Sequence, residues 1–140
     1  SSIEYTVKPT EKAYKAAHDR IMEICRDIGL EFGFKPETEY RVGTERIDVA
    51  WLKRTLGVLE VAIEVEFGAS VTGDLWKLCE SHPKLAVLIV KGSYYKNACD
   101  HATRSEIIKR LRQKLMVLDI SGKTYTIIKG EKLLILPRDN

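Results

Sequence analysis

The stretch that decides the fold reads Arg46-Ile-Asp-Val-Ala-Trp-Leu-Lys53, then Arg54-Thr-Leu-Gly57, then Val58-Leu-Glu-Val-Ala-Ile-Glu-Val-Glu-Phe67. Two runs rich in β-branched residues flank a short turn, so the stretch predicts a β-hairpin. Gly57 supplies the left-handed conformation that closes a three-residue turn, Thr55-Leu56-Gly57. Centred on Leu56, the hairpin places Asp48 directly across from Glu64, with Glu66 two residues further along on the same side.

Alternation along the two strands separates an apolar face from an acidic face. The apolar face, which must be buried, consists of Ile47, Val49, Trp51, Val61, Ile63, Val65 and Phe67. The acidic face carries Asp48, Glu64 and Glu66 together with Ala50, Leu52, Glu60 and Ala62. Like charges opposite each other destabilise a strand pair by a few tenths to about 1 kcal/mol. A divalent cation would remove this repulsion, because Mg²⁺ binds carboxylate oxygens and retained waters. A cross-strand salt bridge between Arg46 and Glu66 would instead leave only Asp48 and Glu64 in conflict.

The rest of the sequence surrounds the hairpin with helices and buried strands. Apolar residues at helical spacing predict a first helix from Glu11 that ends at Gly29, and its buried stripe is Ala13, Ala17, Ile21, Ile24 and Ile28. The capping box Thr103-Arg-Ser-Glu106 predicts the start of a long C-terminal helix. We expect a strand over 38–42, a helix over 72–81, a buried strand over 85–90, the long helix over 103–117, and closing strands over 124–128 and 133–136. The helix over 72–81 and its two flanking strands predict a right-handed crossover.

Composition indicates one globular domain over residues 1–140, with 1–9 as a flexible arm. Hydrophobic residues make up 44% of the chain and charged residues 31%, which excludes a membrane-embedded class. No apolar run approaches the roughly 20 residues of a membrane span, and no signal-peptide core is present, so we expect a cytoplasmic protein. Three cysteines, an odd number without paired spacing, argue against a disulfide framework.

An acidic hairpin between a leading helix and an αβ crossover resembles the restriction-endonuclease-like, or PD-(D/E)XK, nuclease superfamily. The core of that superfamily runs αβββαβ, and its motif is an Asp on the second strand followed by an acid-x-Lys on the third. Ile47-Asp48 stands in the first position and Glu64-Val65-Glu66 in the second. The resemblance covers about residues 11–91. It implies an α/β fold with a central mixed β-sheet flanked by helices, to which this chain adds a C-terminal helix and a β-hairpin.

The sequence departs from the superfamily pattern at two positions. Ile47 replaces a proline that has no catalytic part, and Glu66 replaces the motif lysine. Some members are active with glutamate at that position, and in others the lysine has moved to the following helix, where this chain has Lys77. Because Lys77 lies on the far side of that helix from its apolar stripe of Leu75, Leu78 and Cys79, we expect Lys77 to face solvent or a bound backbone.

The resemblance implies a metal-dependent, endonuclease-like phosphodiesterase that hydrolyses DNA. Asp48 and Glu64 would bind Mg²⁺ or Mn²⁺ together with the backbone carbonyl of Val65. Glu66 would orient or deprotonate the attacking water, which is the task of the lysine in most relatives. Some members also use a glutamate from the first helix or first strand, and Glu39 is the better candidate for this role and Glu23 the weaker.

Several residues outside the hairpin are candidates for contacts to DNA. Ser70 and Thr72 precede or begin a helix and would hold a phosphate near backbone N–H groups, although N-capping of the helix is the alternative. The second half of the chain is basic, with Tyr94 and Tyr95 interleaved, and the candidate phosphate contacts there are Lys91, Lys96, Arg104 and Arg110. Such a charge run also forms the solvated face of many helices. A homodimer would suit the cutting of both strands.

Two other functions are compatible with the same residues. The first is a nucleic-acid-binding or assembly module that keeps the nuclease fold without catalysis, because the motif lysine is missing. The second is a small α/β protein in which the acids only solubilise one face of a sheet. Binding of Mn²⁺ that depends on Asp48 distinguishes the enzyme from both.

Asparagine and glutamine together number three, whereas lysine, arginine, aspartate and glutamate are abundant. This bias is typical of proteins from hot environments. We therefore predict a thermophilic source and a high melting temperature in a thermal unfolding scan. A melting temperature in the ordinary mesophilic range would contradict the prediction.

Overall fold

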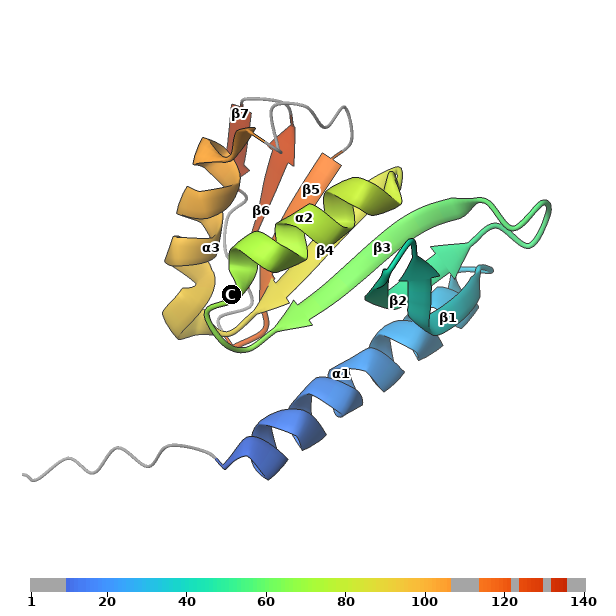
Figure 1. Cartoon of the computed structure of the whole chain (residues 1–140), viewed down its shortest axis with the longest axis horizontal. Helices are drawn as coiled ribbons and strands as arrows, with labels where there is room; N and C mark the ends of the chain where they lie inside the picture. The colour runs from blue at the N-terminus through green and yellow to red at the C-terminus, as the bar shows by residue number, and fades with distance from the viewer. Residues whose placement is uncertain (1–9, 107–113, 122–123, 130–131, 136–140) are drawn as a thin grey trace, which may run out of the picture.

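The computed structural model describes residues 10–106, 114–121, 124–129 and 132–135 (Figure 1). The arm expected over 1–9 lies outside these ranges. The first half contains α1 (Glu11–Glu31), β1 (Lys35–Val42), β2 (Glu45–Leu52), β3 (Leu59–Glu66) and α2 (Val71–Ser81). The second half contains β4 (Leu85–Val90), α3 (Gly92–Arg104), β5 (Lys114–Asp119), β6 (Thr124–Lys129) and β7 (Lys132–Ile135).

In the described part of the chain, seven strands form one mixed sheet in the order β1-β2-β3-β4-β5-β6-β7. β1, β2 and β3 pair antiparallel, β3, β4 and β5 pair parallel, and β5, β6 and β7 pair antiparallel again. The parallel strands occupy the centre, where α2 connects β3 to β4 and α3 connects β4 to β5. The expected α/β fold with a central mixed sheet flanked by helices is confirmed.

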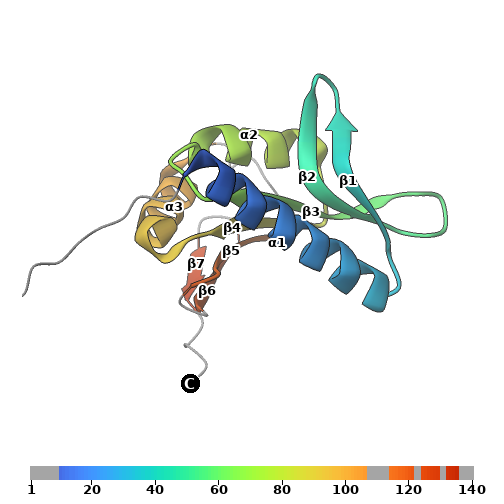
Figure 2. The same ribbon diagram turned by 90° about the horizontal axis from the view of Figure 1, so that it is seen from below.

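Helices cover both faces of the sheet and create two cores (Figure 2). The first core lies between the sheet and the pair α2 and α3, and its members include Leu75, Leu78 and Leu88. The second lies between the sheet and α1, and includes Met22, Cys25 and Ile63. Hydrophobic burial on both faces explains why β4 reads as a continuous apolar run, as expected for a central parallel strand.

The hairpin of β2 and β3 has the predicted register away from its turn, but the predicted three-residue turn is wrong. The Lys53 amide donates to the Val58 carbonyl at 2.8 Å, so the four residues from Arg54 to Gly57 form the turn. Val49 pairs with Ile63 and Trp51 with Val61, and the ladder shifts by one residue between Trp51 and Leu52. Gly57 has a φ of 62°, and Leu56, at 67°, is left-handed as well. The register therefore brings Asp48 and Glu64 to the same end of the hairpin.

The predicted buried stripe of α1 is wrong, and so is the predicted helix end at Gly29. α1 continues to Glu31, its buried residues are Met22, Cys25 and Gly29, and the side chains of Ile24 and Ile28 are exposed. Gly29 serves packing, because a Cβ there would lie within 2.9 Å of three atoms of the Trp51 ring. The Trp51 indole donates a hydrogen bond to the Cys25 carbonyl at 3.0 Å, which fixes this close crossing of α1 over β2.

The apolar face of the hairpin is not continuous at Ile47. Val49 packs in the α1 core, whereas Ile47 packs in the α2 core with Ala62. The change follows an irregularity in the β1–β2 ladder, where Thr38 pairs with Val49 and Tyr40 with Ile47 while Glu39 between them has a φ of 53°. The side chains of Ile47 and Val49 therefore lie on opposite sides of the sheet, and the regular alternation of β2 is interrupted at Asp48, the first candidate site residue.

The expected helix over 103–117 is wrong over its C-terminal part. Helix α3 ends at Arg104, and Lys114–Asp119 forms β5, with Leu115 and Val117 buried in the α2 and α3 core. Thr103 does not begin a new helix, because its hydroxyl donates to the Cys99 carbonyl within α3. The apolar positions of 114–119 fit a strand as well as a helix, which is the known ambiguity of a short apolar run. The part over 107–113 lies outside the described residues, and the two closing strands are confirmed as β6 and β7.

We predict that Gly29→Ala lowers the free energy of unfolding by about 1 to 2 kcal/mol. Overpacking a core costs about 1 to 3 kcal/mol, and the gain in helix propensity from glycine to alanine offsets part of it. Gly73→Ala is the matched control, because a Cβ at Gly73 in α2 meets no atom within 4 Å. Urea denaturation of both variants measures the difference. Equal or greater stability of Gly29→Ala would contradict the crossing of α1 over Trp51.

Candidate active site

The carboxylates of Asp48 and Glu64 accept hydrogen bonds from backbone amides across β2 and β3. The Asp48 amide donates to Glu64 Oε1 at 2.9 Å, and the Val65 amide donates to Asp48 Oδ2 at 2.8 Å. These bonds occur next to the Val49–Ile63 pair, so carboxylates replace backbone carbonyls as acceptors here. Hydrogen bonds from backbone amides to carboxylates are charge-assisted, so they offset part of the repulsion between the two acids.

Glu64 is buried to an unusual degree for a carboxylate, with 1% of its surface exposed. Burial, and then the charge of Asp48, raise the pKa of Glu64 above its ordinary value. Lys77 on α2 opposes both effects, because its Nζ lies 3.0 Å from Glu64 Oε2. A buried carboxylate without such a partner would be strongly destabilising. Within residues 10–106, the ion pair on this carboxylate is therefore made by Lys77, and the alternative pair of Arg46 with Glu66 does not form.

The prediction that Lys77 faces solvent or a bound backbone is wrong. Leu75 and Leu78 are buried as expected, but Val71 and Asp74 are buried too, which widens the inner face of α2 towards Lys77. The ammonium also donates to the Arg46 carbonyl at 3.2 Å. Burial lowers the pKa of Lys77, but its hydrogen bond to Glu64 and the charges of Glu64, Asp74 and Asp48 raise it above its usual value. Lys77 is therefore a charged ammonium in the cluster.

Asp74 completes the cluster and is the residue that the sequence reasoning missed. Its pKa is raised to about 9, first by burial and then by the charges of Glu64 and Glu66 and hydrogen bonds to them. The carboxyl is therefore protonated at neutral pH. Its Oδ2 is buried and has no hydrogen-bond partner. The signal in the sequence was its spacing of three residues before Lys77, which puts both on one side of α2.

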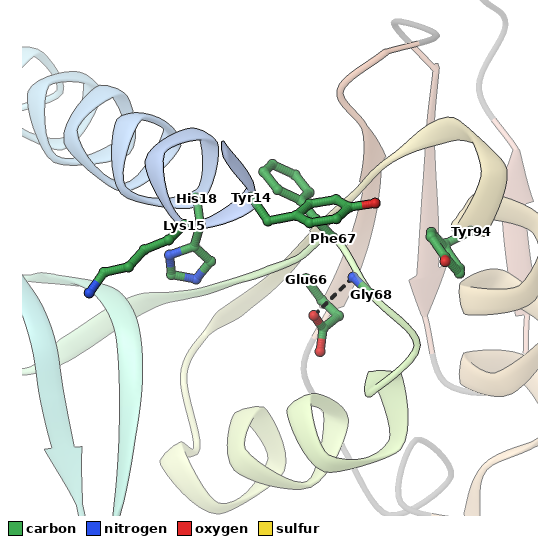
Figure 3. Close-up of a pocket in the computed structure, with 7 residues that line it drawn as sticks. All are labelled: Tyr14, Lys15, His18, Glu66, Phe67, Gly68 and Tyr94. Atoms are coloured by element: carbon green, nitrogen blue, oxygen red, sulfur yellow. Dashed lines mark hydrogen bonds between the residues drawn. The ribbon is translucent and has the colours of Figure 1, made fainter. Parts of the chain in front are cut away.

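Glu66 and His18 border the cluster on the side of α1. Glu66 Oε2 accepts a hydrogen bond from the Gly68 amide at 3.1 Å, and His18 Nε2 lies 3.2 Å from Asp48 Oδ2. Both residues line a pocket of about 450 Å³ that also involves Tyr14, Phe67 and Tyr94 (Figure 3). The His18 ring therefore joins this pocket to the acids.

A second pocket, of about 380 Å³, lies at the beginning of α2. Ser70, Thr72, Asp74 and Lys77 line it, so the two sequence candidates for phosphate contacts lie beside the cluster. Ser70 occupies the N-cap position but makes no side-chain capping hydrogen bond. The capping alternative for Ser70 is therefore wrong, and its hydroxyl is available to a ligand at the helix N-terminus.

The remaining candidates lie elsewhere. Glu39 is exposed in β1, and Glu23 is exposed and pairs with Arg20 on α1. Lys91 Nζ lies over the rings of Tyr14 and Phe67, at 5.6 and 6.0 Å from their centroids, which places it near the Tyr14 pocket. Lys96 and Arg104 are exposed on α3, and Arg110 lies outside the described residues.

The arrangement contains two side chains suited to a divalent cation, and the rest of the shell would have to come from backbone and water. Among the described residues, no three His, Cys, Asp or Glu side chains are grouped as a preformed metal centre. Mg²⁺ does not require one, because it usually keeps several waters and binds through one or two carboxylates. The adjacent carboxylates of Asp48 and Glu64 fit such an ion chemically.

Comparison with protein-family models and with curated proteins finds no match to this chain. The resemblance to nucleases therefore depends on the residues and the order of elements. In the part of the chain that the structure describes, no helix is both long and apolar enough to cross a membrane.

We predict that Asp74→Asn flattens the dependence of stability on pH. The pKa of Asp74 lies at about 9 in the folded protein and has an ordinary value of 3.8. The native state therefore binds more protons between these values, so stability falls as pH rises through that window. Asparagine does not titrate, so the variant does not lose this stability as the pH rises. Between pH 4 and pH 8, the free energy of unfolding of Asp74→Asn should therefore rise relative to that of the wild type by more than about 1.4 kcal/mol, the equivalent of one pKa unit.

The measurement is urea denaturation at several pH values in the presence of a chelator. Asp100→Asn, at an exposed position of α3, is the control and should follow the wild-type profile. Parallel profiles for Asp74→Asn and wild type would contradict the raised pKa of Asp74.

Proposed function

We propose that this chain is a metal-dependent phosphodiesterase of the restriction-endonuclease-like type, which hydrolyses DNA with its lysine supplied from α2. The single observation that carries the proposal is the contact of Lys77 with Glu64, beside Asp48, on the end of a β-hairpin. The missing motif lysine was the main objection from the sequence. An ammonium that reaches the same carboxylate from the following helix removes that objection.

The order of elements supports the same proposal. Helix α1 precedes an antiparallel meander of β1, β2 and β3, and α2 then leads to β4, which pairs parallel with β3. This is the αβββαβ order that the resemblance implies, and the acids lie on the second and third strands as it requires. The burial of Glu64, at 1% exposed, also excludes the reading in which this acid only solubilises the sheet.

Asp48 and Glu64 would hold Mg²⁺ or Mn²⁺, with the backbone carbonyl of Val65 as a further ligand. Such an ion lowers the pKa of a bound water and stabilises charge on a phosphate. Hydrogen bonds from the Val65 and Asp48 amides fix the orientation of the two carboxylates before any ligand binds, as supporting contacts do in metal sites.

The remaining residues divide the other tasks. Lys77 stays protonated, so it would act as a cation that stabilises charge developing on the phosphate rather than as a base. Ser70 and Thr72 would hold phosphate oxygens at the beginning of α2. Glu66 would orient the attacking water from the opposite side of the cluster.

The alternative function is a nucleic-acid-binding module without catalysis. The observation in its favour is that Glu64 already has a cationic partner, Lys77, and that Asp48 already accepts hydrogen bonds within the protein, so the cluster is held together without a metal. Metal binding separates the two functions.

We predict that Mn²⁺ binds the wild-type protein at millimolar concentration or below, as measured by calorimetry, and that Asp48→Ala abolishes this binding. Asp48 contributes one of only two side-chain ligands, so its loss leaves Glu64 alone with Lys77. Asp19→Ala, at a more exposed position on α1, is the control and retains binding. Absence of Mn²⁺ binding to the wild type would favour the binding module.

We predict that Lys77→Met lowers the rate of plasmid nicking by about 10² to 10⁴-fold, the range for loss of one group that acts on the transition state. Lys84→Ala is the matched control, because Lys84 is exposed and shares Glu60 with Lys53. Thermal unfolding of each variant checks the fold, since Lys77→Met leaves Glu64 without its cation. Nicking by Lys77→Met at the wild-type rate would contradict the role of Lys77.

A further inference from the structure

We propose that the pocket between α1 and α3 binds an unpaired nucleobase of a DNA strand, so that the substrate is a single strand or a strand end rather than intact duplex. The inference extends the proposed function by naming the form of its substrate. It depends on that function for the identity of the ligand as DNA.

Three aromatic side chains from separate elements meet at this pocket (Figure 3). Tyr14 comes from α1, Tyr94 from the first turn of α3, and Phe67 directly follows β3. The volume, about 450 Å³, falls in the range of roughly 300 to 1,000 Å³ that is typical of small-ligand pockets. Phe67 is buried, whereas Tyr14 and Tyr94 are half-buried and keep ring surface available. Aromatic rings of this kind are the usual platform on which the bases of a single strand stack.

Charged side chains lie at and beside the pocket: Lys15 and Glu66 line it, and Lys91 lies next to two of its rings. The Lys91 ammonium lies over the rings of Tyr14 and Phe67, which is a cation–π arrangement. The same ammonium is thereby placed at the pocket, where it would neutralise the phosphate attached to a stacked base. Lys15, which also lines the pocket, adds a second cation.

The pocket is joined to the acid cluster by one of its own lining residues. His18 Nε2 lies 3.2 Å from Asp48 Oδ2, and Glu66, which also lines the pocket, follows Glu64 by two residues on β3. A base in the pocket would therefore place the adjoining phosphodiester next to Asp48 and Glu64. A paired and stacked base cannot enter such a pocket without leaving the duplex, which costs a few kcal/mol. An unpaired base enters without that cost, so the pocket favours single-stranded substrate.

The test is the binding of a short, fluorescently labelled DNA strand, followed by fluorescence anisotropy in the presence of EDTA so that no cleavage occurs. A blunt duplex of the same length and sequence is the comparison. We expect the single strand to bind more tightly than the duplex. We also expect Tyr14→Ala or Tyr94→Ala to lower the affinity for the single strand about tenfold or more, because the loss of one base–aromatic stack costs about 1 to 3 kcal/mol of binding free energy. Tyr14→Phe and Tyr94→Phe keep the ring and should bind within about twofold of wild type.

Equal affinity for single strand and duplex, or alanine variants that bind like the phenylalanine variants, would overturn the proposal. Circular dichroism confirms that each variant is folded. The outcome is separate from that of the proposed function, because Glu64→Gln should abolish cleavage and leave EDTA-resistant binding of the single strand intact. If the wild type binds single strands through the tyrosines but cleaves no DNA, the proposed nuclease function is contradicted and the proposed base-binding pocket is supported.

Discussion

The burial of the Glu64 carboxylate under α2 is the constraint on which the rest of the site depends. An isolated buried carboxylate costs several kcal/mol, so the surrounding elements must supply a cation, a proton or hydrogen bonds. The structure supplies all three, through the ammonium of Lys77, the proton of Asp74 and the backbone amide of Asp48. The packing of helix α2 on the sheet brings Lys77 to Glu64 and buries Asp74 beside it.

The charges of the acid cluster are only partly compensated within the protein. Four carboxyl groups, Asp48, Glu64, Glu66 and Asp74, gather at the cluster with one lysine, so the cluster is not fully neutralised, and burial raises the pKa of Glu64 and of Asp74. Such incompletely compensated groups are common at functional sites, because the compensation can be exchanged for a ligand. The two pockets lie on opposite sides of the cluster, one with the beginning of α2 and one with the aromatic rings of α1 and α3.

The parts of the fold that depend on local geometry could be predicted from the sequence. Alternation along β2 and β3 gives the predicted register near Val49 and Ile63, although the turn has one residue more than predicted and a bulge between Trp51 and Leu52 compensates for it. The other errors concern contacts made by residues distant in sequence. Gly29 resembles a helix end until Trp51 is known to lie against it, and Lys77 is predicted to face solvent until Asp74 is known to be buried. A protonated aspartate has no mark in the sequence, because its pKa is set by Glu64 and Glu66 from another strand.

The most direct test of the central claim is a crystal of this protein soaked in Mn²⁺ and measured for anomalous scattering. We expect an anomalous peak between the carboxylates of Asp48 and Glu64, within coordination distance of the Val65 carbonyl. A map without a peak there, with the Lys77 ammonium still on Glu64, would contradict the assignment of these acids as metal ligands and with it the hydrolytic function.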